Sequence, residues 1–233
     1  MKKVQFEDLG NIKYKDAWDY QEGIFNRYLK IKAENRNLSS EESQEIEGKV
    51  LFCEHPHVYT LGKSGEQNNL LINEQFLNKI DASYFKTNRG GDITYHGPGQ
   101  IVGYPIIDLE RFNLQVKQYI GNLEEAIILA LREYGISSER LSGATGVWID
   151  INTNKARKIC AIGVKASRFI TMHGFALNVN TNLEYFNHIN PCGFIDKGVT
   201  SMQKELNQEV DFAEVKNVVK TKISEVFGMD LKE

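Results

Sequence analysis

The chain has 233 residues, of which 41% are hydrophobic and 25% are charged, and its formal net charge is −3. These values are typical of a folded globular protein, and they argue against a disordered chain or one that binds nucleic acid through a basic surface. The first residues lack the apolar run of a secretory signal, and no stretch reaches the roughly 20 apolar residues of a membrane-spanning helix. We therefore expect a cytoplasmic protein with no membrane partner.

The first predicted element is a helix from about residue 14 to residue 33, whose apolar spacing is less regular than that of the later helices. It leads into the polar stretch ENRNLSSEESQEIEGK, residues 34–49, which we interpret as a solvated insertion. Runs rich in β-branched and aromatic residues then predict strands. These runs are residues 49–55, 57–62, 82–87 and 101–109.

A long amphipathic helix is predicted over residues 116–134, where apolar residues recur at helical spacing up to Gly135. Further strands are expected at residues 146–150, 158–166 and 175–180. The last helix is expected over 211–227, beginning at a possible capping box and ending at Gly228. Strands before and after a long helix, without regular alternation, favour an α+β fold. No repeat or flexible linker divides the chain, so we expect residues 1–233 to form a single domain.

The segment RGGDITYHGPGQ, residues 89–100, is rich in glycine and carries directional polar side chains. Glycine lets a ligand approach the backbone closely because it has no side chain and tolerates positive φ. The segment matches neither a nucleotide P-loop nor the dinucleotide-binding glycine pattern. A binding loop is the better interpretation, and a purely structural hairpin stays open.

The second informative segment is NPCG, residues 190–193, which presents Cys192 between turn residues. With the glycine-rich segment it suggests an acyl-group site with a cysteine nucleophile. Cys53 and Cys160 lie within apolar strand runs and are expected to be buried. The odd number of cysteines and the absence of a CxxC spacing predict free thiols, and no metal site is expected.

Several ordered motifs resemble the lipoyl(octanoyl) transferases of lipoate biosynthesis. The motifs are EHPHVYTLGK at 54–63, RGGDITYHGPGQIVGYPIIDL at 89–109, GVWID at 146–150, KICAIGVKASRFITMHGFALNVN at 158–180 and NPCG at 190–193. The resemblance implies the mixed α/β fold of biotin and lipoate protein ligases. It also implies transfer of an octanoyl group from acyl carrier protein to a specific lysine of lipoyl domains, in 2-oxoacid dehydrogenase complexes and in the glycine cleavage H protein. No cofactor is implied, since phosphopantetheine arrives on the acyl carrier protein.

The family's functional positions can be carried over residue by residue. The resemblance implies that Cys192 carries the acyl thioester and that Lys158 is its catalytic partner. The implied substrate-binding residues are Arg89, Gly90, Gly91, Asp92, Ile93, Thr94, Tyr95, His96, Ala161, Ile162, Gly163, Gly174, Phe175 and Ala176.

The chemistry of these residue types agrees with that assignment. A cysteine splits thioester-to-amine transfer into two easier steps, and a neighbouring ammonium from Lys158 favours its reactive thiolate. A dyad of Cys192 with His96 or His173 is an alternative. Other functions also stay open: an ATP-dependent lipoate or biotin ligase, an enzyme that moves octanoyl groups between carrier proteins, and a noncatalytic protein that binds lipoyl domains or acyl carriers.

Overall fold

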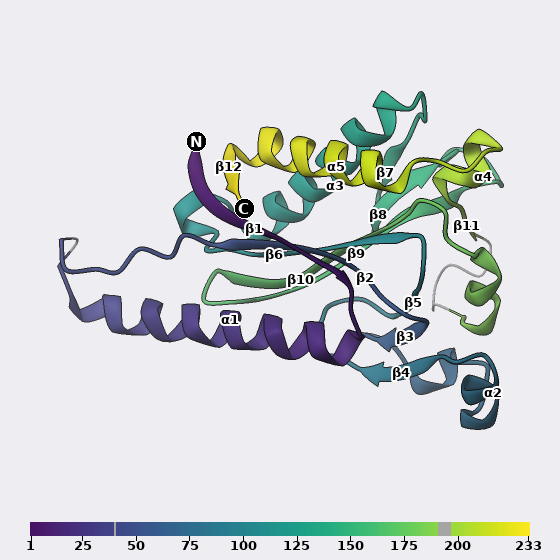
Figure 1. Cartoon of the computed structure of the whole chain (residues 1–233), viewed down its shortest axis with the longest axis horizontal. Coiled ribbons are helices and arrows are strands. Elements are labelled where there is room, and N and C mark those ends of the chain that lie inside the picture. Colours follow the sequence, from purple (N-terminus) through teal and green to yellow (C-terminus); the bar gives the residue numbers. More distant parts are fainter. Residues whose placement is uncertain (40, 191–196) are drawn as a thin grey trace.

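Two β-sheets form the frame of the computed structural model, which describes residues 1–39, 41–190 and 197–233 (Figure 1). The larger sheet has the order β12-β1-β2-β6-β10-β9-β8-β7, with β11 paired to β9. Its strands are β1 (Lys2–Asn11), β2 (Lys49–Glu54), β6 (Gln100–Ile106), β7 (Glu139–Leu141), β8 (Ala144–Ile149), β9 (Arg157–Ser167), β10 (Ile170–Asn178), β11 (Gly198–Val199) and β12 (Met229–Lys232). The smaller sheet, β4-β3-β5, consists of β3 (Val58–Leu61), β4 (Ser83–Lys86) and β5 (Ile93–His96).

Helices cover both faces of the larger sheet. Figure 1 shows α1 on one face and α3 with α5 on the other, and α2 beside the smaller sheet. The helices are α1 (Tyr14–Glu34), α2 (Glu74–Lys79), α3 (Val116–Glu133), α4 (Met202–Leu206) and α5 (Phe212–Phe227), and the short 3-10 turns are η1 (Asn35–Asn37), η2 (Gln67–Asn69), η3 (Glu110–Phe112) and η4 (Leu183–His188). Parallel and antiparallel pairs occur in one sheet, so the predicted α+β class is confirmed.

The long helices follow from local sequence. In α3, Tyr119, Leu123 and Ile127 are fully buried at helical spacing, and a reciprocal capping box of Gln115 and Gln118 starts the helix. Helix α5 begins where the Asp211 carboxylate accepts hydrogen bonds from two backbone amides of its first turn, and it ends at Gly228 in the left-handed region. Both predicted helices are therefore confirmed within a residue of their ends.

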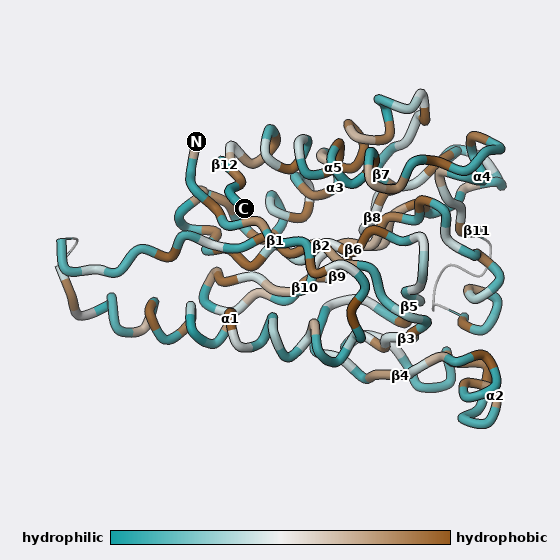
Figure 2. The backbone as a smooth tube through the Cα atoms, in the orientation of Figure 1, coloured by the Kyte–Doolittle hydropathy of each residue, from teal (hydrophilic) through white to brown (hydrophobic). Residues whose placement is uncertain are grey.

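The apolar core has one layer on each side of the larger sheet. Hydrophobic residues concentrate along the central strands in Figure 2, while the outer turns of α1 are hydrophilic. One layer joins the sheet to α3 and α5, and the other joins it to the buried stripe of α1. A third, smaller cluster packs the β4-β3-β5 sheet against α2 and η4. These layers hold β9 and β10 in the middle of the molecule.

Two strands at the chain ends were not expected from the sequence. Strand β1 pairs in parallel with β12, so residue 2 lies opposite residue 229. Val4 and Phe6 are the buried residues of β1 within an otherwise polar run, which is too weak an alternation to predict a strand. Strand β1 is held by pairing with β2 and β12. These partners lie far from it in the sequence, so the local sequence alone does not reveal the strand.

The glycine-rich segment also differs from expectation. Residues 93–96 form β5, which pairs with β3, whereas β6 starts at residue 100 and pairs with β2 and β10. The two strands therefore belong to different sheets, and the hairpin alternative is wrong. Residues 89–92 and 97–99 are the non-strand parts of the segment, and they flank the short strand β5.

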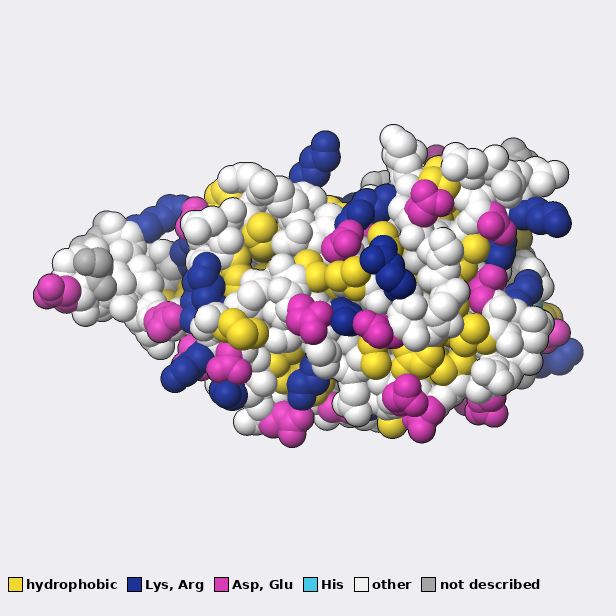
Figure 3. Space-filling model, turned by 90° about the horizontal axis from the view of Figure 1, so that it is seen from above, with side chains coloured by type: hydrophobic (Ala, Val, Ile, Leu, Met, Phe, Trp, Pro, Cys, Tyr) yellow, Lys and Arg dark blue, Asp and Glu magenta, His cyan; other side chains and the backbone are white. Residues whose placement is uncertain are grey.

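The face shown in Figure 3 is mixed in charge and also carries hydrophobic patches. Lysine and arginine side chains alternate with carboxylates over the face shown in Figure 3. Most of residues 34–49 is exposed as predicted, but Ile46 is buried in the core layer under α1, so the stretch is anchored at that point. Within residues 1–39, 41–190 and 197–233, no helix is long and apolar enough to cross a membrane.

Candidate active site

A cavity of about 820 Å³ opens where the two sheets meet. Its walls come from the segment before β5, from β8, β9 and β10, and from η4 with the residues around it. Of the implied substrate-binding residues, all except Gly90 and Tyr95 line it, and Lys158 lines it as well. The structure thus brings together segments that lie up to about a hundred residues apart in the sequence.

Strand register explains how two of these segments meet. In the antiparallel pair β9 and β10, Gly163 lies opposite Gly174, Phe175 opposite Ile162, and Ala176 opposite Ala161. The two implied binding patches are therefore cross-strand neighbours. The Gly90 amide donates to the Val164 carbonyl at 2.9 Å, which joins the glycine-rich segment to the same place.

Gly163 permits this close approach. A Cβ at this position would lie 2.8 Å from the Gly90 carbonyl oxygen and 3.3 Å from the Arg89 side chain. Only a residue without a side chain lets β9 and the glycine-rich segment touch here.

Arg89 is a buried cation at the cavity wall, with 7% of its surface exposed. Its Nη2 donates to the Thr60 carbonyl at 2.6 Å and to the Thr60 hydroxyl at 3.0 Å, and its Nη1 donates to the Gly90 carbonyl. None of the ion pairs among the described residues includes Arg89. Burial lowers the pKa of Arg89, although arginine stays charged at any ordinary pH. The described hydrogen bonds of the Arg89 guanidinium therefore go to neutral oxygen atoms.

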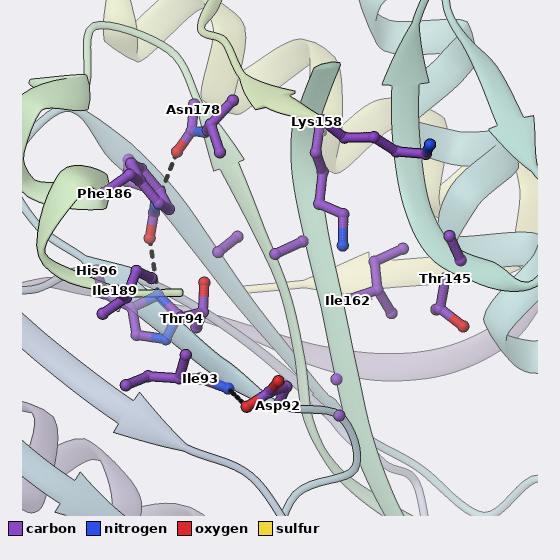
Figure 4. Close-up of a pocket in the computed structure, with 18 of the residues that line it drawn as sticks. Asp92, Ile93, Thr94, His96, Thr145, Lys158, Ile162, Asn178, Phe186 and Ile189 are labelled. Atoms are coloured by element: carbon purple, nitrogen blue, oxygen red, sulfur yellow. Dashed lines mark hydrogen bonds between the residues drawn. The ribbon is translucent and has the colours of Figure 1, made fainter. Parts of the chain in front are cut away.

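His96 is held in one orientation by a chain of hydrogen bonds, drawn in Figure 4. Its Nδ1 bonds the Gln100 amide oxygen at 2.8 Å, and the Gln100 amide nitrogen donates to the Asn178 amide oxygen, also at 2.8 Å. The Asn178 amide nitrogen donates to the Thr200 carbonyl. Because an amide oxygen only accepts, Nδ1 carries the proton. Burial lowers the pKa of His96 to about 3, so the ring is neutral at physiological pH.

Tyr95 faces away from the cavity, as expected for a neighbour of Thr94 and His96 in a strand. It is fully buried, its hydroxyl lies 2.7 Å from His57 Nδ1, and its ring stacks on Tyr185. This contact attaches η4 to β5. Tyr95 and Gly90 thus support the cavity wall from behind.

Lys158 projects from β9, and its Nζ lies 4.7 Å from the centre of the Trp148 ring. Burial lowers the pKa of Lys158, and the nearby charge of Arg89 acts in the same direction. A larger fraction of Lys158 is therefore neutral near physiological pH than for an exposed lysine. Figure 4 shows Lys158 across the cavity from His96, Phe186 and Ile189.

Cys192 lies outside the described residues. The described residues on either side of that segment, Asn190 and Lys197, both line the cavity. The remaining cysteines, Cys53 and Cys160, are buried, and burial raises the pKa of both thiols well above the usual range. The expectation that these two are buried strand residues is confirmed, and neither has the exposure that a reactive thiolate requires.

His173, the alternative partner of Cys192, lies away from the cavity. His173 is buried under α1 and does not line the cavity; its Nε2 bonds the Asn88 side chain at 2.7 Å. Across the described ranges, no group of three or more histidine, cysteine, aspartate or glutamate side chains could hold a metal ion. The cavity is also lined by residues that were not expected from the sequence: Gln100, Gly143, Ala144, Thr145, Trp148, Asn178, Leu183, Glu184, Phe186, Asn187, Ile189, Asn190, Lys197, Gly198, Val199 and Lys204. The spacing of Leu183 and Phe186 was a weak signal for the helical turn that carries them.

Comparison with known proteins identifies the family. The model of the lipoyl protein ligase A/B catalytic domain matches residues 13–224. An octanoyltransferase of Christiangramia forsetii is 54% identical, over 99% of this chain and 98% of the relative. One of Flavobacterium johnsoniae is 53% identical, over 99% of both chains.

Solved structures support the same fold. A bipartite lipoate protein ligase of Thermoplasma acidophilum superposes with a TM-score of 0.70 at 15% identity, over all of this chain and 87% of that one. A lipoate-protein ligase A bound with ATP has a TM-score of 0.66 at 14% identity, over 99% and 87%. At these identities the structures support the fold alone, whereas the full-length relatives support the function. The chain belongs to the octanoyltransferases of the lipoyl protein ligase A/B catalytic-domain family.

Proposed function

We propose that this acyltransferase takes its octanoyl group from octanoyl acyl carrier protein, holds it as a thioester on Cys192, and passes it to a lysine of a lipoyl domain. The observation that carries the proposal is the cavity, in which the implied acyl-contact residues of β9 and β10 lie beside Lys158 and beside the residues flanking the Cys192 segment.

The first step would form the acyl-enzyme. The Cys192 thiolate attacks the octanoyl carbonyl, the bond to the phosphopantetheine sulfur breaks, and that sulfur leaves as a thiolate that takes up a proton. Thioester exchange is nearly balanced in energy, because one carbon–sulfur bond replaces another. The mixed apolar and polar lining of the cavity suits an alkyl chain that ends in a reacting carbonyl.

The second step would form the amide. A substrate lysine attacks the acyl-enzyme carbonyl with its neutral amine, the bond to Cys192 sulfur breaks, and the attacking nitrogen loses a proton. Lys158 fits both steps, since its ammonium favours the Cys192 thiolate and its neutral amine accepts the proton. The lowered pKa of Lys158 makes the neutral form accessible near physiological pH.

We expect the acceptors to be lipoyl domains of 2-oxoacid dehydrogenase complexes and the glycine cleavage H protein, and the reaction to be cytoplasmic. No cofactor is part of the proposal, because phosphopantetheine comes with the donor. In this scheme the acyl group is already activated as a thioester, so ATP has no role.

Intact-protein mass spectrometry with octanoyl acyl carrier protein tests the proposal. Wild type and a Cys53→Ala/Cys160→Ala double variant should each gain one octanoyl group that hydroxylamine removes, and Cys192→Ser should gain no such thioester. Addition of a lipoyl domain should move the group to a lysine without ATP or magnesium. A thioester mapped to Cys53 or Cys160 would exclude the proposed nucleophile, and strict dependence on ATP and free octanoate would identify a ligase.

A further inference from the structure

A carboxylate stands on the buried stripe of α3, behind the cavity. Glu124 is only 8% exposed, although its neighbours on that face are apolar core residues. One carboxylate oxygen accepts the Gly146 amide at 3.0 Å, and the other lies 3.3 Å from Arg140 Nε. A buried carboxylate is costly unless it is satisfied, and its two observed partners come from β8 and β7.

Gly146 lies next to both this carboxylate and the Lys158 side chain. A Cβ on Gly146 would lie 3.4 Å from Lys158 Cε and 2.6 Å from the Cys160 carbonyl oxygen, and its φ of +124° favours glycine. The Gly146 amide thus bonds Glu124, while the open side of its α-carbon lies against the lysine side chain. Because Gly146 has no side chain, Lys158 can lie close to the backbone segment whose amide is hydrogen-bonded to Glu124.

Trp148 holds the other side of the lysine. The pairing of β8 with β9 shifts register between Val147 and Trp148, and after this irregularity Trp148 lies opposite Lys158. A bulge of this kind redirects the side chains around it. The indole nitrogen donates to the Ala144 carbonyl at 2.9 Å, which fixes the ring whose centre is 4.7 Å from Lys158 Nζ. The lysine ammonium therefore meets an aromatic face in a favourable cation–π arrangement.

We propose that Glu124 and Trp148 are positioning residues for Lys158: the indole face holds its ammonium directly at the cavity wall between turnovers, while Glu124 acts through the Gly146 backbone that it fixes and through its own charge, which Arg140 weakens by pairing with it. This inference rests on the role of Lys158 in the proposed function.

The charges that face Lys158 come from several elements. Burial and the Arg89 guanidinium, from the segment before β5, both lower the pKa of Lys158. Glu124 from α3 acts in the opposite direction, whereas the buried Cys160 thiol of β9 stays protonated and carries no charge. Lys197 and Lys204 line the same cavity from the β11 side. Removal of the Glu124 charge should therefore make the lysine lose its proton more readily.

The test is the pH dependence of labelling at Lys158 in the full-length enzyme, measured with a small amine-acylating reagent and peptide mass spectrometry. In Glu124→Gln the labelling midpoint should fall below that of wild type, so labelling at a fixed pH below the midpoint should rise. Arg140→Met, at a half-exposed position, should move the midpoint upward. The matched control is Glu133→Gln, which removes the same charge from the far end of α3, where Glu133 pairs with Lys222.

Two further variants test the indole face. Trp148→Phe and Trp148→Leu both lose the hydrogen bond to Ala144, but only phenylalanine keeps an aromatic face. The midpoint should fall further in the leucine variant, and equal midpoints would remove Trp148 from the inference. A Glu124→Gln midpoint equal to that of Glu133→Gln, or an Arg140→Met shift in the same direction as Glu124→Gln, would overturn the role of Glu124.

Failure of this inference is distinct from failure of the proposed function. Labelling reports the state of Lys158 whether or not the lysine takes part in transfer. Wild-type transfer by Lys158→Ala would instead remove the lysine from the mechanism, while the labelling midpoints of the other variants would still stand.

Discussion

The basic side chains of Arg89 and Lys158 line the same cavity, and the charge of Arg89 lowers the pKa of Lys158. The guanidinium stays charged, so the lysine is the group that can give up its proton. Burial holds His96 neutral and outweighs its hydrogen bond to Gln100, which favours the charged ring. At the residue scale, Lys158 is therefore a better proton acceptor than the cavity histidine, whose low pKa makes it a weak base.

Substitution of Lys158 separates its two proposed roles. Lys158→Ala should raise the midpoint of the Cys192 alkylation profile and lower turnover by roughly 10²- to 10⁴-fold, because both the nearby cation and the base are lost. Lys158→Arg should restore much of the thiolate but little turnover, since arginine keeps its proton. Alkylation by iodoacetamide at a series of pH values, read by mass spectrometry, measures the first effect.

Lys155→Ala is the matched control, because Lys155 lies in an exposed turn three residues away. It should change neither quantity. Identical alkylation profiles in wild type and Lys158→Ala would contradict the charge role and make His96 the next partner to test.

At the element scale, the cavity depends on how closely β9 approaches the glycine-rich segment. Gly163→Ala would force a Cβ to within 2.8 Å of the Gly90 carbonyl. We expect it to cost about 1–3 kcal/mol of unfolding free energy and to slow acyl-enzyme formation, because β9 must move away from Arg89. Urea unfolding and the rate of octanoyl uptake measure the two effects.

Gly121→Ala is the contrasting substitution. A Cβ at Gly121, within α3, would meet no atom within 4 Å, so alanine should stabilise the helix by roughly 0.5–1 kcal/mol and leave acylation unchanged. Equal effects of the two substitutions would show that close approach at Gly163 is not required.

The elements also show how far the sequence could predict the fold and the site. Helices α3 and α5 follow from local periodicity and caps, so their ends were predictable. Strand β5 was not, because its partner in the other sheet is set by long-range packing. In the site, the motifs identified the cavity residues of the glycine-rich segment, β9 and β10, but not those of β8, η4 and β11, and the pairing of β9 with β10 is a property of register. The one sequence signal for Glu124 was a charged residue on an otherwise apolar helix face. Its connection to the site follows only from its hydrogen bond to Gly146, which lies beside Lys158.

In the molecule as a whole, α1 and the strands beneath it bury three histidines in the interior. Burial lowers the pKa of His55 to about 4 and that of His96 and His173 to about 3, compared with 6.5 when exposed. All three rings contact α1, those of His55 and His96 through Tyr14 and that of His173 through Trp18. His55 also bonds the Ile12 carbonyl and Tyr104, and the His173 backbone amide donates to Gln21 of α1. Acid should therefore destabilise the fold as a whole.

The sign of this dependence follows from proton binding. Below pH 6.5 an unfolded histidine binds a proton, whereas folded His173 stays neutral until about pH 3, so the unfolded state binds more protons in that window. Each such histidine should lower the unfolding free energy by about 1.4 kcal/mol per pH unit as pH falls from 6.5 toward the folded pKa. For His173 the cost has a visible cause: its Nδ1 is buried with no hydrogen-bond partner among the described residues.

His173→Asn tests this argument, because asparagine tolerates the left-handed backbone at this position, where φ is +58°. The difference in unfolding free energy between wild type and variant should shift with pH between 7 and 4.5, with wild type losing stability faster toward acid. Ile170→Val, a buried substitution in the same strand, should cost about 0.5–1.5 kcal/mol at every pH. Urea unfolding at four pH values supplies the curves. Parallel curves for wild type and His173→Asn would mean that His173 takes up its proton equally in both states, and the interior would then not hold that residue neutral.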